Sequence, residues 1–201
     1  MYSTKPGLIL GFHGCDESIV EKVLKGDDDL IKSQNEYDWL GNGIYFWENS
    51  AERAYDFAKE LMNTSRNKSI KKPAVIGAVI NLGYCLDLID FSNLQLLKEG
   101  YEILEQTYLN NNMELPQNIP VKNSSDILIR KLDCKVIETI HQGMINRKQF
   151  DSVRSVFWEG NELYKTAGFK EKNHIQICIR NPNCIKGYFL PRILNEEWDR
   201  V

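Results

Sequence analysis

The segment 38–60, DWLGNGIYFWENSAERAYDFAKE, runs from a glycine-bounded loop into a strand and then into a helix. Its residues 43–48, GIYFWE, are rich in β-branched and aromatic side chains, which favours a strand. Asn49 or Ser50 can cap the helix that follows, because such side chains accept hydrogen bonds from free backbone amides. Three aromatic residues directly follow a Gly-Asn-Gly sequence, so this strand is a candidate both for core packing and for contact with a ligand.

The remaining segments predict one α+β domain, 1–201, with strands near both ends and helices inserted between them. Apolar runs and alternation predict the strands, and helical spacing predicts the helices. The predicted strands are 8–13, 43–48, strand-rich 73–89, 150–158, 174–181 and 184–190; the predicted helices are 16–26, the segment after 49, 91–108 and 125–142. Asp16 or Ser18 is expected to cap the first helix, and Gly26 suits its C-terminal end.

The composition is that of a globular domain, with 42% hydrophobic and 26% charged residues in a chain of 201. The formal charge of −3 gives no overall positive field for nucleic acid or an anionic membrane. No signal peptide is expected at the N-terminus, and no run reaches the roughly 18 apolar residues that span a bilayer. These features predict a cytoplasmic protein without a membrane anchor.

The five cysteines are odd in number and form no CxxC pair. A disulfide framework and a zinc site are therefore not expected, and reduced, buried thiols are predicted instead. No other cluster predicts a metal site.

Three motifs follow one another along the chain. His13-Gly14 ends the first predicted strand, and GNGIYF (41–46) leads into the next one. In the strand 174–181, Gln176 precedes Pro182 and shares a face with His174 and Cys178. In this order the motifs resemble the ADP-ribosyltransferase superfamily, on the His-Tyr-Glu side typified by diphtheria toxin and the poly(ADP-ribose) polymerases, with Gln176 where that family has Glu.

The resemblance implies a split β-sheet core with inserted helices, and a cleft for NAD, the substrate, between its halves. Tyr45 would offer an aromatic shelf to the cationic nicotinamide. Gly14 would bind the carboxamide through its backbone, because no side chain stands in the way. His13 and Gln176 would contact ribose hydroxyls, since each can donate and accept. The glycines of 41–46 would let backbone approach the ligand.

Each of these roles has a structural alternative. His13 can be a buried structural histidine, Tyr45 a core aromatic residue, and Gln176 an ordinary strand residue. Ser50 is a candidate carboxamide partner or simply part of the helix start, and Tyr55 is a second aromatic wall if the helix pattern is shifted by one residue.

The loop before the last motif contributes the remaining candidates. In the resembled family this loop faces the acceptor, which makes Glu159 a further catalytic candidate, with Glu162 and His174 nearby. The alternative for Glu159 and Glu162 is solvated loop charge. His141, at the end of a predicted helix, is expected to be a C-terminal cap.

The resemblance implies NAD-dependent ADP-ribosyl transfer to a protein or nucleic acid acceptor, with release of nicotinamide. A hydrogen bond to a charged acceptor is worth about 1.5–3 kcal/mol, roughly double a neutral one, so Gln176 favours transfer of one ADP-ribose over chain elongation. The compact size resembles bacterial toxins and effectors, for which a neutralising antitoxin or immunity protein would be a partner. The alternatives are an NAD glycohydrolase and a non-catalytic NAD- or ADP-ribose-binding module.

Overall fold

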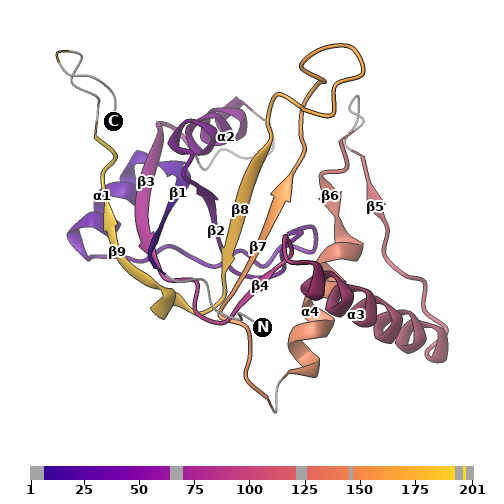
Figure 1. The fold of residues 1–201 in the computed structure, drawn as a ribbon. Helices are drawn as coiled ribbons and strands as arrows, with labels where there is room; N and C mark the ends of the chain where they lie inside the picture. The colour runs from indigo at the N-terminus through magenta and orange to yellow at the C-terminus, as the bar shows by residue number, and fades with distance from the viewer. Residues whose placement is uncertain (1–6, 64–69, 121–125, 145–146, 193–196, 198–201) are drawn as a thin grey trace.

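Seven strands form one sheet in the order β4-β7-β8-β2-β1-β3-β9, and β5-β6 form a separate ribbon, within the residues that the computed structural model describes, 7–63, 70–120, 126–144, 147–192 and 197 (Figure 1). The strands are β1 (Ile9–Asp16), β2 (Ile44–Glu48), β3 (Pro73–Ile80), β4 (Cys85–Asp87), β5 (Asn118–Ile119), β6 (Ile129–Arg130), β7 (Ser152–Phe157), β8 (His174–Ile179) and β9 (Ile185–Phe189). The helices are α1 (Glu17–Lys25), α2 (Ala51–Asn63), α3 (Phe91–Asn110), α4 (Lys131–Gly143) and the 3₁₀ turn η1 (Pro182–Cys184). The prediction of a single α+β domain is confirmed.

The sheet is mixed and opens in its middle. β4 and β7 run parallel, whereas the other paired strands are antiparallel. β1 pairs with β3 along its whole length, but with β2 only at Gly11↔Glu48 and Phe12↔Trp47. Beyond Phe12 the two central strands therefore separate, and each continues with its other neighbour.

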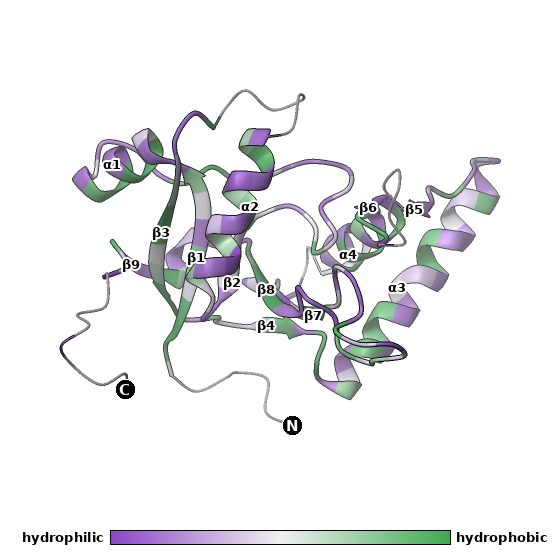
Figure 2. Cartoon of the chain, turned by 90° about the horizontal axis from the view of Figure 1, so that it is seen from above, coloured by the Kyte–Doolittle hydropathy of each residue, from purple (hydrophilic) through white to green (hydrophobic). Residues whose placement is uncertain are grey.

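Successive side chains along each strand point to opposite faces of the sheet, so apolar residues reach both faces. Helices cover both of these faces. On the α1 face, Phe46 and Ile177 pack with Val20 and Val23 of α1. The α2 face carries Trp47 against Ala54 of α2, and further along it Cys178 against Ile137 of α4. Seen from above, α2 lies over the β1–β3 region and the α3–α4 pair lies beyond β7 (Figure 2).

Several local predictions are confirmed. Asp16 caps α1 by accepting a hydrogen bond from the Ser18 amide, and Gly26 ends that helix in the left-handed conformation at φ 78°. Ser50 Oγ accepts from the Arg53 amide at the start of α2. Because all these bonds form within a few residues, the local sequence is sufficient to predict them.

Other boundaries were predicted wrongly. β1 does not end at His13 but runs to Asp16, because its pairing with β3 continues as far as Asp16↔Pro73. The helix predicted at 125–142 begins at Lys131, because β6 first pairs with β5. The side chain of His141 does not cap the end of α4: its Nδ1 donates to the carbonyl of the preceding turn and its ring packs against Phe150.

Some predictions concern residues outside the described ranges. These are the N-terminal residues 1–6, most of the polar loop 63–72, and residue 125. Among the helices that the structure describes, none combines the length and the apolar character needed to cross a bilayer.

Candidate functional site

The three motifs lie on three consecutive strands. His13 and Gly14 are on β1, Tyr45 is on β2 and Gln176 is on β8, and these strands are neighbours in the order β8-β2-β1. The register places Tyr45 opposite Cys178, and Trp47 opposite Gln176. Segments that are far apart in the chain therefore meet at the point where β1 and β2 separate.

Backbone groups of Gly14 face this opening. The amide of Asn49 donates to the carbonyl of Leu10 at 3.0 Å, so Leu10 directs its backbone groups toward β2. Because this direction alternates along a strand, Gly14 directs its amide and carbonyl the same way. The strand register between β1 and β2 has ended there, and the carbonyl of Tyr45 accepts a hydrogen bond from His13 Nδ1 at 2.8 Å instead. Gly14 thus presents a donor and an acceptor side by side at the opening, which is the pair that a carboxamide requires.

Gly14 also has a packing reason to be glycine. A Cβ atom at this position would collide with the carbonyl oxygen of Ala54 and crowd Ala58. Any side chain would therefore displace α2 from the sheet. The absence of a side chain at Gly14 serves helix packing as well as the backbone approach expected from the sequence.

His13 projects from the α1 face, away from Gln176. Its ring meets the Phe46 ring edge-on, with centroids 5.9 Å apart. Burial lowers the pKa of His13, although its bond to the Tyr45 carbonyl raises it. The ring is therefore neutral at pH 7, its Nδ1 carries the proton, and its Nε2 is an acceptor. The structure does not bring the His13 side chain to the face that carries Tyr45 and Gln176.

Tyr45 is anchored by its hydroxyl group. The hydroxyl donates to the Gly41 carbonyl at 2.8 Å and accepts from the Leu40 amide at 3.0 Å. The ring is half-buried against a core cluster that includes Leu40 and Cys178, and burial raises the pKa of Tyr45 well above its ordinary value. Tyr45 thereby ties the loop 38–43 to the sheet.

Gln176 is held by the same loop. The indole N–H of Trp39 donates to Gln176 Oε1 at 2.8 Å, and Gln176 is only 9% exposed. The Trp39 ring packs edge-on against Phe157, and the guanidinium of Arg130 lies over both rings. The Gln176 amide is therefore fixed in orientation, with one oxygen lone pair engaged by Trp39.

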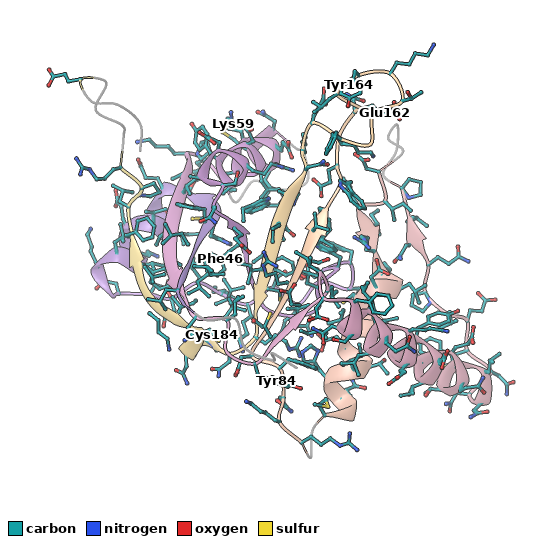
Figure 3. The ribbon with its side chains drawn as sticks, in the orientation of Figure 1. Phe46, Lys59, Tyr84, Glu162, Tyr164 and Cys184 are labelled. Atoms are coloured by element: carbon teal, nitrogen blue, oxygen red, sulfur yellow. The ribbon has the colours of Figure 1, made fainter. Side chains whose placement is uncertain are left out.

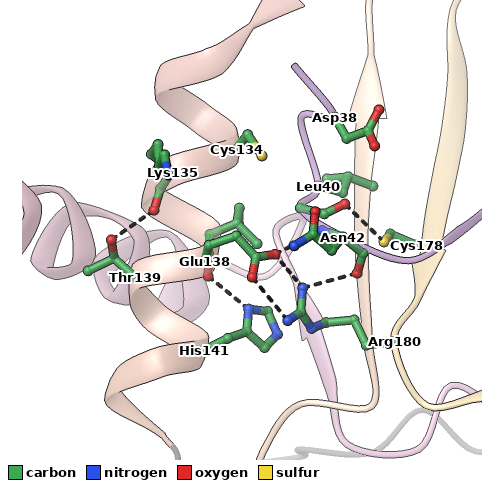
Figure 4. Close-up of polar contacts among 12 residues, drawn as sticks. Asp38, Leu40, Asn42, Cys134, Lys135, Glu138, Thr139, His141, Cys178 and Arg180 are labelled. Atoms are coloured by element: carbon green, nitrogen blue, oxygen red, sulfur yellow. Dashed lines mark hydrogen bonds and ion pairs between the residues drawn. The ribbon is translucent and has the colours of Figure 1, made fainter. Parts of the chain in front are cut away.

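An ion pair between Arg180 and Glu138 also holds the loop 38–43 in place (Figure 4). Arg180 donates to Glu138 and to the Asn42 carbonyl, and Glu138 also accepts from the Asn42 amide at 2.8 Å. Gly41 is left-handed at φ 77°, and a Cβ there would lie 2.5 Å from a Glu138 oxygen. A Cβ at Gly43 would meet the Cys178 sulfur. Both glycines thus allow the loop to pack on α4 and β8.

Two further candidates, Ser50 and Tyr55, lie directly before α2 and within it. Ser50 caps the helix at its N-terminus. Tyr55 is 41% exposed, and the Lys59 ammonium lies 4.9 Å from its ring centroid. Neither residue contacts the side chains of Tyr45 or Gln176 through any described hydrogen bond or ring contact.

A second polar cluster, centred on Trp47, lies beside Gln176 on the α2 face. The ring of His174 lies 6.2 Å from that of Trp47, and the Arg53 guanidinium lies 5.8 Å from the Trp47 ring. Arg53 also pairs with Glu159 at 3.0 Å, which links α2 to the loop 158–173. This loop projects from the sheet, with Glu162 and Tyr164 on it (Figure 3). Glu159 is thus the half of an ion pair rather than a solvated charge, whereas Glu162 is exposed.

Trp39 and Phe157 also line a cavity of about 420 Å³. Its walls come from α3, α4, β7 and the segment before β6, and they are mainly apolar, with charged groups among them. Ser155 and Glu159 line it, and Ser155 is the register partner of Gln176. The cavity therefore begins next to the candidate catalytic glutamine.

The sequence analysis did not single out Trp39, Arg53 or Arg130. An arginine one turn into a helix and an arginine at the end of a two-residue strand carry no local signal. Trp39 had one weak signal, because it is a large aromatic residue inside a polar loop.

Cysteine and metal chemistry find no support in the described residues. The five cysteines are buried, as predicted, and burial raises the pKa of Cys15, Cys134 and Cys184 to about 11. These thiols are therefore protonated at pH 7 and poor nucleophiles. No group of three or more His, Cys, Asp or Glu side chains in the described ranges is arranged to hold a metal ion.

Comparison with known proteins finds a similarity to an archaeal protein. The chain is 25% identical over 198 residues to an uncharacterized protein of Methanocaldococcus jannaschii, covering 87% of this chain and 83% of that protein. No family model and no solved structure matches the chain.

Proposed function

We propose that this protein cleaves the nicotinamide–ribose bond of NAD and transfers one ADP-ribose to a macromolecular acceptor. The observation that carries the proposal is the meeting of three distant motifs on the adjacent strands β8, β2 and β1. They meet where the backbone donor and acceptor of Gly14 face an opening in the sheet.

The geometry suggests how the roles are divided. Gly14 binds the carboxamide, and the ring of Tyr45 borders the nicotinamide. His13 acts indirectly, because its bond to the Tyr45 carbonyl replaces the strand pairing and helps to hold the opening. Gln176 keeps one oxygen lone pair and its amide N–H groups for the ribose hydroxyls, since Trp39 uses the other lone pair.

Electrostatics favour a single transfer. Loss of nicotinamide leaves a cationic, oxocarbenium-like sugar. A neutral glutamine stabilises that charge less than a glutamate would, and the nearby Glu159 is already paired with Arg53. Action as a cytoplasmic toxin or effector, restrained by an antitoxin or immunity protein, belongs to the same proposal.

The test is nicotinamide release from NAD together with labelling of a whole-cell lysate by labelled NAD, read in separate protein and nucleic-acid fractions. Gln176→Ala is expected to lower turnover by roughly ten- to a hundredfold, about 1–3 kcal/mol of barrier, and to change NAD affinity little. Gln176→Glu should keep or raise nicotinamide release, because it restores a charged acceptor. Gln95→Ala, on the exposed side of α3, is the matched control and should leave the rate unchanged.

Each outcome assigns a function. A mass shift on an acceptor supports transfer, and nicotinamide release without one supports a glycohydrolase. NAD binding without turnover supports a binding module, which the occupied oxygen of Gln176 and the absence of a carboxylate at this position favour as the second candidate. Parent-rate turnover by Gln176→Ala would move the catalytic role to Glu159.

A further inference from the structure

Unpaired polar atoms gather around Trp47. Of the five buried side-chain nitrogen or oxygen atoms without a hydrogen-bond partner in the described residues, four belong to Trp47, Arg53 and His174. They are Trp47 Nε1, Arg53 Nε and Nη1, and His174 Nε2; Arg53 Nη1 lies 3.7 Å from a Glu60 oxygen, an ion pair without a hydrogen bond. Trp47 and His174 are 3% and 9% exposed, and the Arg53 side chain is 11% exposed. Because buried polar groups are normally paired, such a concentration indicates a site for a polar ligand group.

The tautomer of His174 follows from its one hydrogen bond. Nδ1 lies 2.6 Å from the Lys172 carbonyl, which can only accept, so Nδ1 carries the proton. Burial lowers the pKa of His174, although the Lys172 carbonyl and the charge of Glu159 raise it and Arg53 lowers it further. The ring is therefore neutral at pH 7, and Nε2 is an unprotonated acceptor. Stacking on Phe157, with centroids 5.3 Å apart, fixes the plane of the ring.

The three residues offer complementary groups. Trp47 Nε1 and Arg53 Nε donate, whereas His174 Nε2 accepts. A hydroxyl group matches this set, because its oxygen accepts and its proton is donated. A guanidinium or ammonium group has no lone pair for Trp47 and would be repelled by Arg53. A carboxylate or phosphate group has no proton for His174 at neutral pH.

We propose that this cluster holds the acceptor hydroxyl of the transfer reaction and that His174 Nε2 is its general base. The proposal rests on the proposed function. Trp47 is the register partner of Gln176, and His174 lies two residues before Gln176 on the same strand face, so the hydroxyl would lie next to the ribose. The hydroxyl oxygen attacks C1′ of the ribose, the C1′–N bond breaks with its electron pair leaving on nicotinamide, and the hydroxyl proton moves to Nε2.

The charges around the cluster favour a serine or threonine of a protein as the source of this hydroxyl. Three cations of α2 and the loop 158–173 are paired in the described residues: Arg53 with Glu159 and Glu60, Lys170 with Asp126, and Lys172 with Glu60. A nucleic acid would bring phosphates to a chain of net charge −3, and in the described residues Arg53, Lys170 and Lys172 already have carboxylate partners. A protein side chain needs no such neutralisation.

His141 provides a matched comparison. Its Nδ1 also donates to a backbone carbonyl, at 2.8 Å, and its Nε2 is the fifth unpaired atom. However, its described ring contact is with Phe150, in an apolar cluster, and no donor with an unpaired atom lies beside it. A buried histidine alone is therefore not sufficient; the neighbouring donors make the His174 cluster a site.

The experiment uses methanol as a hydroxyl probe and agmatine as a guanidine probe, each added with NAD to the full chain. Mass spectrometry measures O-methyl-ADP-ribose, the agmatine adduct and free ADP-ribose, and nicotinamide release is measured in parallel. The parent protein should form the methyl adduct and no agmatine adduct. His174→Asn should lower the rate of adduct formation roughly 10²–10⁴-fold, because its amide can keep the bond to Lys172 but lacks the base. His141→Asn, the same change elsewhere, should keep the parent rate.

The outcomes separate this inference from the proposed function. Nicotinamide release with an agmatine adduct, or with free ADP-ribose as the sole product in methanol, overturns the hydroxyl site and leaves NAD cleavage standing. Absence of nicotinamide release from the parent protein overturns both. Parent-rate adduct formation by a folded His174→Asn protein removes the general base. In the lysate, label mapped to serine or threonine supports a protein source, and label in RNA overturns it.

Discussion

Arg154 of β7 and Arg53 of α2 lie on opposite sides of the same sheet and differ in how completely the protein pairs them. Arg154, on the α1 face, bonds Glu48 through Nε and Nη2 and Asp87 through Nη1. Arg53, beside Trp47 on the α2 face, has a hydrogen bond to Glu159 from Nη2, while Nε and Nη1 have none. Glu48 and Trp47 are neighbours on β2, so one strand contributes to both clusters. A fully paired cluster serves stability, and an incompletely paired one is available to a ligand.

Breaking the paired cluster should have the largest effect. Arg154→Met leaves Glu48 and Asp87 buried without their cation, and removal of one partner from a buried ion pair costs about 3–5 kcal/mol. Urea denaturation should show a loss of this size in the free energy of unfolding. The matched Arg53→Met substitution should cost less, about 1.5–3 kcal/mol, because one hydrogen bond to Glu159 and a longer ion pair to Glu60 are lost.

Equal losses in these two variants would contradict the comparison. They would indicate that Arg53 is as much a structural residue as Arg154. The Trp47 cluster would then need an explanation from packing alone.

The difference between the clusters also shows what the sequence could predict. Caps and periodicity act within a few residues, and they correctly predicted α1 with its caps and the strand β2. The end of β1 and the start of α4 depend on pairing with distant strands, β3 and β5, and were missed. Alternation along β8 correctly placed His174, Gln176 and Cys178 on one face, because period two is a local property.

The candidate site was predictable only in part, for the same reason. The motifs indicated Tyr45 and Gln176, which do share a face. The bond from Trp39 to Gln176 and the pairing of Arg53 with Glu159 join residues from distant segments, which no spacing rule reveals. His13 and Gln176 were both expected to contact ribose hydroxyls, but the side chain of His13 points to the α1 face, opposite to that of Gln176.

Tyr45 offers a second, intermediate test, because its hydroxyl is fully paired like Arg154. Tyr45→Phe leaves the Leu40 amide without its partner and the Gly41 carbonyl with the weak Cys178 thiol donor alone, which should destabilise the protein by about 1–3 kcal/mol. Calorimetric NAD titration should show a smaller effect in Tyr45→Phe than in Tyr45→Ala, because the ring is kept. Unchanged stability in Tyr45→Phe would show that water replaces the hydroxyl and that the loop 38–43 does not depend on it.

The smallest predicted effect is the pH dependence of stability that arises from the three histidines. Burial lowers the pKa of His13, His141 and His174 below the ordinary value of 6.5. Below pH 6.5 the unfolded chain therefore binds protons that the folded chain does not, and the free energy of unfolding falls as the pH is lowered. Each histidine contributes at most about 1.4 kcal/mol per pH unit, between 6.5 and its own pKa. Urea denaturation at pH 7.5, 6.5 and 5.5 (roughly one unit on either side of the ordinary value) measures this slope.

Single substitutions assign the slope to residues, because Asn can keep the bond that each Nδ1 makes to a backbone carbonyl while removing the titration. His13→Asn, His141→Asn and His174→Asn should each flatten the dependence. Glu159 lies close enough to His174 to raise its pKa and partly offset the burial, as Glu138 does for His141. Glu159→Gln should therefore steepen the loss of stability below pH 6.5, and it should do so only while His174 is present. A slope that Glu159→Gln leaves unchanged would mean that the carboxylate does not act on His174, and Arg53 would be left as the charge that shifts the pKa of this base.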